Sequence, residues 1–147
     1  MSKTTDSLAA VIAWLHPLLP QGTALHGLEL PAGWQPSPTA LALPDGGGRA
    51  LDLPVIHQAL AFWCYGRTAE EARDVADTLC GLLHRSAVMK ITTSMGDVYV
   101  GPGEVLTEPL YLREPDTLCH RWIVRASVRV SETPVQVEEP EPGPVPT

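Results

Sequence analysis

Four side chains of this 147-residue chain are of types that hold metal ions: Cys64, Cys80, Cys119 and His120. Protein zinc sites normally use close ligand pairs such as Cys-x-x-Cys, and the chain has no such pair. Cys119 and His120 are adjacent, so on a strand they would point to opposite faces. The spacing therefore favours cysteines buried as small hydrophobic residues over a metal site, and we expect no cofactor.

A nucleophile paired with a base is the second chemistry to consider, and Cys80 could pair with His57 or His84. Cys80 falls on or beside the apolar side of a predicted helix, so core packing is the favoured interpretation. The chain contains no Gly-x-Ser-x-Gly, and its Gly-Gly-Gly run lacks the Gly-Lys-Ser/Thr of a phosphate-binding loop. We expect no enzymatic activity.

A stripe of arginines occupies one side of the last predicted strand. Trp122, Val124 and their alternate neighbours are apolar, whereas Arg121, Arg125 and Arg129 fall on the opposite side. Such a stripe could bind an acidic partner, including DNA phosphates. A solvated strand face, or ion pairs with Glu70 or Asp77, is the favoured alternative.

Two loops are candidates for contact with other proteins. Asp45, Gly46, Gly47, Gly48 and Arg49 form a predicted turn between two strands, and their glycines would let the tip adapt to a partner. Trp34 lies in a proline-rich loop, where an aromatic side chain suits an interface.

One strand and one helix form the centre of the predicted fold. Apolar residues lie on both sides of the strand expected within residues 51–65, which indicates a central strand covered on both faces. Gly66 then leads into a helix at residues 68–85. Thr68 is a good N-cap, and Glu71 three residues later completes a capping box. Apolar residues recur along this helix at the spacing of one face.

Shorter elements surround this pair. A first helix, capped by Asp6 or Ser7, should end before Pro17. Strands are predicted at residues 24–30, 39–43, 87–93, 97–100, 106–113 and 121–130, with a break at residues 101–103. The sequence thus predicts an α+β fold: a mainly antiparallel sheet with one long amphipathic helix on one face and a short N-terminal helix.

Domain organisation follows from composition. Residues 1–131 suit a single domain, while residues 132–147 are acidic and proline-rich and should be disordered. The net charge is −7, and four glutamates of the tail carry much of it. We see no basic cluster for sequence-specific nucleic-acid binding, no signal peptide and no span long enough for a membrane. Three widely spaced cysteines suit a reducing cytosol.

The order of the pieces adds a resemblance. A helical start is followed by PSPTALALPDGG, a strand ending in FWCYG, the capped helix TAEEARDVADTLCGLL, then GPGEVLTEPLY and the closing strand RWIVRASVRV. From Ser7 to Val130 this resembles the tail terminator proteins of long-tailed bacteriophages, also called minor tail or tail completion proteins.

The resemblance implies a structural role in the virion tail, assembled in the cytoplasm of the bacterial host. Such proteins form a ring, a hexamer, on the finished tail tube. They stop tube growth and present the joining surface to the head-completion or connector proteins, and DNA passes through the ring. A head–tail connector protein is the first alternative. A small cytoplasmic enzyme or ligand-binding domain is the alternative from another class.

Overall fold

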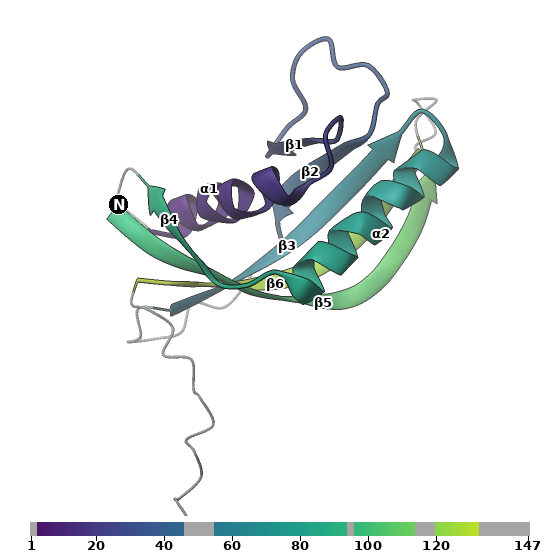
Figure 1. The fold of residues 1–147 in the computed structure, drawn as a ribbon. Coiled ribbons are helices and arrows are strands. Elements are labelled where there is room, and N and C mark those ends of the chain that lie inside the picture. Colours follow the sequence, from purple (N-terminus) through teal and green to yellow (C-terminus); the bar gives the residue numbers. More distant parts are fainter. Residues whose placement is uncertain (1–2, 46–54, 94–95, 114–119, 133–147) are drawn as a thin grey trace, which may run out of the picture.

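The computed structural model describes residues 3–45, 55–93, 96–113 and 120–132. It shows an α+β fold with one six-stranded, curled sheet in the order β1-β2-β3-β6-β5-β4 (Figure 1). The strands are antiparallel except for β1 and β2, which run parallel. The elements are α1 (Lys3–Leu15), the short 3-10 helix η1 (His16–Leu18), β1 (Ala24–Gly27), β2 (Thr39–Pro44), β3 (Val55–Gly66), α2 (Ala69–Arg85), β4 (Met89–Thr93), β5 (Gly96–Arg113) and β6 (His120–Ser131).

Both long helices cover the same side of the sheet, which we call the inner face (Figure 1). The opposite side is called the outer face. Alternation along the strands sends apolar side chains inward, where they meet the apolar sides of α1 and α2. The largest fully buried side chains of this core are Trp14, Phe62, Leu15, Leu60, Leu79 and Leu83. The predicted fold class is confirmed.

Helix α2 begins as the sequence predicts, with one difference in its cap. The Thr68 hydroxyl accepts a hydrogen bond from the Glu71 amide at 3.1 Å. The Glu71 carboxylate, however, does not complete the reciprocal box on Thr68. It accepts three bonds from Arg67: from the backbone N–H at 2.9 Å and from the guanidinium at 3.1 and 2.7 Å. The contacts at the start of the helix therefore also fix Arg67, the residue before the N-cap.

Gly66 allows the tight passage from β3 to α2. A Cβ atom at this position would lie 2.5 Å from the backbone nitrogen of Ala72, closer than real Cβ contacts come. Because the strand end and the first helical turn nearly touch, only glycine fits there. The helix is thereby returned onto the inner face directly above its own strand.

The expectation of a break at residues 101–103 is wrong. Strand β5 runs without interruption from Gly96 to Arg113. The ladder with β6 shifts register between Val100 and Gly103, so the glycine–proline pair is absorbed as a bulge. Gly101 has a φ of +109°, which suits glycine, and the strand bends there instead of ending. A further shift spans Pro109, as a proline in an edge strand requires.

Three smaller expectations also need correction. Helix α1 starts at Lys3, and Ser7 lies inside it, buried, donating a hydrogen bond to the Gln58 side chain instead of capping. Strand β1 ends at Gly27, because Leu28 has a φ of 69°. The outer side of β3 is not covered along its whole length, since His57 is exposed.

Replacing Leu79 by Ala should lower the free energy of unfolding by about 2–5 kcal/mol, because the fully buried side chain would leave a cavity between α2 and the sheet. Urea denaturation measures the change. The exposed His84 on the same helix provides the control, and His84→Ala should stay within about 0.5 kcal/mol of wild type. Similar losses in both variants would mean that the side of α2 that packs on the sheet is wrongly assigned.

The Arg67 hydrogen bonds lower the pKa of Glu71 from 4.5 to about 2. Since the folded carboxyl holds its proton less tightly than the unfolded one, its stabilising effect is present above pH 4.5 and is lost as the pH falls toward 2. Arg67 is largely exposed, so solvent weakens the effect. Between pH 5 and pH 2, the melting temperature of Glu71→Gln should fall less steeply with decreasing pH than that of wild type. Glu70→Gln should keep the wild-type pH dependence.

Candidate interaction surfaces

The arginine stripe lies on the outer face, as its alternation predicts. In β6 the inward positions Val124, Ala126 and Val128 are buried, and Arg125 between them is exposed. The neighbouring strands place Tyr65, Ala61 and His57 of β3 opposite Arg121, Arg125 and Arg129 in register. The three arginines share one face, yet each has a different environment.

Arg125 is the most open of the three. Its guanidinium pairs with the Asp45 carboxylate at 3.2 Å, and its side chain remains 58% exposed. Asp45 follows β2, so the pair ties the start of the predicted turn to β6. The ion-pair partner expected for the stripe was Glu70 or Asp77, and for Arg125 the structure shows Asp45 instead. Gly46, Gly47, Gly48 and Arg49 lie outside the described residues.

Arg121 lies on an aromatic platform. Its guanidinium carbon is 4.2 Å from the ring centre of Trp63, which is a cation–π contact. Trp63 belongs to a second apolar cluster on the outer face, built around Leu41 and Tyr65. The Trp63 side chain is half-buried there, on the side of β3 away from the two helices.

Trp34 covers one end of this second cluster. Its ring meets Tyr65 edge-on at 5.2 Å between centroids, and its indole N–H donates to the Thr39 hydroxyl at 3.1 Å. The loop before β2 is therefore fastened to the outer face of its own sheet. Trp34 is half-buried by this contact, which leaves part of the ring at the surface.

Arg129 completes the stripe. Its Nε atom is buried and, within the described part of the chain, has no hydrogen-bond partner. A buried guanidinium donor without an acceptor costs free energy. His57 lies beside it in register and adds no negative charge.

Exposed leucines on β5 were not singled out from the sequence. Leu106, Leu110 and Leu112 are 53%, 59% and 39% exposed. Leu110 and Leu112 pair with Ile123 and Arg121 and share their outer face. Beyond Val100, β5 has no strand on its far side among the described residues, because β4 pairs only with residues 96–100. Pro109 was the available sequence signal for this edge.

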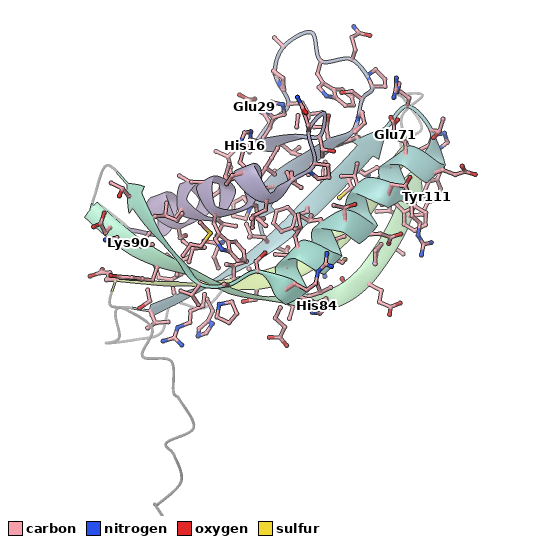
Figure 2. All side chains as sticks on the ribbon, viewed as in Figure 1. His16, Glu29, Glu71, His84, Lys90 and Tyr111 are labelled. Carbon is pink, nitrogen blue, oxygen red and sulfur yellow. The ribbon has the colours of Figure 1, made fainter. Side chains whose placement is uncertain are left out.

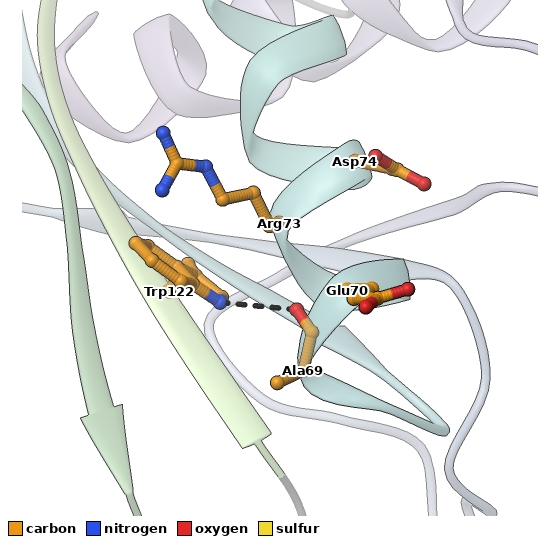
Figure 3. A pocket seen from close by; sticks show the side chains of 5 residues that line it. All are labelled: Ala69, Glu70, Arg73, Asp74 and Trp122. Atoms are coloured by element: carbon orange, nitrogen blue, oxygen red, sulfur yellow. Dashed lines mark hydrogen bonds between the residues drawn. The ribbon is translucent and has the colours of Figure 1, made fainter.

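A cleft of about 320 Å³ lies between the start of α2 and β6, lined by Ala69, Glu70, Arg73, Asp74 and Trp122. The Trp122 indole donates to the Ala69 carbonyl at 3.2 Å, and Arg73 lies over its ring at 4.7 Å. Figure 3 shows Glu70 and Asp74 turned away from the indole. Arg73 thus already occupies the aromatic face, and the carboxylates point toward solvent.

The two described cysteines pack in or against the core, whereas His57 and His84 are exposed. Cys64 is buried in the core, and burial raises the pKa of its thiol, which keeps it protonated. Burial also raises the pKa of the half-buried Cys80. No group of three or more potential metal ligands occurs among the described residues, and Cys119 lies outside them. No helix in the described part is long and apolar enough to cross a membrane.

Trp34→Ala should lower the free energy of unfolding by at least about 1 kcal/mol, because it removes the edge-on contact with Tyr65 and uncovers apolar surface. Trp34→Phe keeps a ring and loses the bond to Thr39, so its loss should be smaller. Chemical denaturation of the dilute protein measures both. A wild-type stability for Trp34→Ala would mean that Trp34 serves only contacts with other molecules.

No protein-family model matches the chain, and no curated protein matches it.

Proposed function

We propose that this protein is a structural virion protein that caps the phage tail tube as a ring. In this role it ends tube polymerisation and provides the surface that joins the head. The observation that carries the proposal is the one-sided sheet: both helices cover the inner face, and the outer face presents arginines and exposed leucines. Apolar side chains beside charges on a rigid sheet suit protein contact.

The order of segments supports this role, since it resembles tail terminator proteins from Ser7 to Val130. The partners we propose are further copies of the chain, six in the ring, together with the tail tube protein and a head-completion or connector protein. The net charge of −7 suits a ring through which DNA slides, because like charge opposes binding of phosphates.

The turn predicted at residues 45–49, after β2, is the proposed contact with the tube or a neighbouring subunit. Asp45 is held by Arg125, so the turn starts from a fixed point on the sheet. The glycines that follow give the backbone freedom to fit a partner. Binding loops on a rigid scaffold are a common arrangement.

Replacing Gly46 and Gly48 by Leu in the phage genome should leave a folded protein and yield abnormally long tails or tails that fail to join heads. Electron microscopy of lysates measures tail length and joining, and circular dichroism checks folding. Lys90→Leu, an exposed change on β4, is the control and should give normal tails.

Different outcomes separate the alternatives. Normal-length tails that stay unjoined favour the head–tail connector role. Normal assembly would show that this turn does not make the contact. Absence of the protein from purified virions refutes the virion role and reopens the enzyme or ligand-binding alternative.

A further inference from the structure

Two charged surfaces of opposite sign lie on opposite sides of this subunit. The first is the pair Arg125 and Arg129 on the outer face of β6. The second is the acid stripe, which we define as Glu70, Asp74 and Asp77 on α2. All three acids are exposed, and their spacing of four and three residues places them along one side of the helix.

The sheet separates the two surfaces. Helix α2 packs on the inner face through Ala72, Val75 and Leu79, so its exposed acids point away from the sheet. Figure 3 shows Glu70 and Asp74 directed outward from the helix. The arginines lie beyond the other side of the same sheet. One copy therefore presents the three acids of α2 in one direction. In the other direction it presents the two arginines, with Asp45 paired to Arg125 and Glu104 opposite Ser127 between them.

We propose that the acid stripe of one copy docks on Arg125 and Arg129 of the next copy, head to tail. This inference rests on the proposed ring and names its subunit contact. A contact between two different surfaces of the same chain is heterologous, and it generates a ring when the rotation closes. Charge complementarity fixes which surfaces meet.

The spacing of the two surfaces matches. Four residues along a strand place Arg125 and Arg129 about 13 Å apart. Seven residues along a helix place Glu70 and Asp77 about 10 Å apart. Arginine side chains are long enough to span the difference.

The ion pairs within one copy leave both surfaces exposed to a neighbouring copy. Arg125 keeps more than half of its side chain exposed while paired with Asp45, and Asp77 is 56% exposed while paired with Arg73 at 3.5 Å. Leu110 and Leu112, on the same outer face, add apolar area beside the charges.

Two charge-reversed proteins test the contact. The acid-reversed variant carries Glu70→Lys and Asp74→Lys, and the base-reversed variant carries Arg125→Glu and Arg129→Glu. Each then has two surfaces of like charge. If the base-reversed variant does not fold, Arg125→Glu alone replaces it, because that side chain is the most exposed.

Sedimentation at several protein and salt concentrations measures assembly. We expect wild type to form rings that dissociate as salt rises, and each reversed variant alone to dissociate at a protein concentration at least tenfold higher than wild type. An equimolar mixture of the two variants should restore rings, because alternating copies again match at every contact. Such alternation closes in a six-membered ring and requires an even number of subunits.

Lys90→Glu and Asp97→Lys are the controls and should assemble as wild type does. Both are exposed on the β4–β5 hairpin, and Figure 2 places Lys90 at the end of the molecule opposite Tyr111. Reversed variants that assemble like wild type, or a wild type that stays monomeric throughout, overturn the contact. Loss of binding to duplex DNA by the base-reversed variant, with its assembly unchanged, would assign the arginines to nucleic acid. Tail length and virion content test the proposed function separately.

Discussion

The pairing of β3 with β6 is the constraint on which the rest of the structure depends. Twelve residues of each strand, from Val55 to Gly66 and from His120 to Ser131, pair in continuous register. Because side chains alternate, this one register decides which residues meet the helices and which stay on the outer face. A shift by one position would bury Arg125 and expose Val124, at a large cost in free energy.

The inner and outer faces then follow different physical rules. The inner face is closed by α1 and α2 and stabilised by burial of apolar surface. On the outer face, charge and aromatic contacts replace a helical cover: Trp34 on Tyr65, Arg121 on Trp63 and Arg125 with Asp45. These contacts fix the orientation of side chains that remain partly open to other molecules.

This asymmetry is the structural basis of the assembly proposed above. Helix α2 presents acids on the side away from the sheet, and β6 presents arginines beyond the other side. The cleft at Trp122 leaves little aromatic surface for a ligand, since Arg73 already covers the indole. The surfaces with unused capacity are therefore broad and charged, which suits contact between proteins more than enclosure of a small ligand.

The sequence by itself determined the elements whose signals are local. The Thr68 cap, the apolar side of α2 and the alternation of β6 depend on near neighbours, and all three are present in the structure. The arginine stripe was predictable for the same reason. The turn residues 46–49 and the tail beyond Glu132 lie outside the described residues, so their predicted roles stay predictions.

Only the tertiary structure decided the features that depend on distant residues. Residues 101–103 look like a break because glycine and proline interrupt strands locally, yet pairing with β6 carries β5 through them as a bulge. Arg125 found Asp45, eighty residues away in sequence, because β3 lies between their strands in the sheet. The contacts of each arginine depend on which strands are neighbours in the sheet. Long-range pairing of this kind leaves no local signal in the sequence.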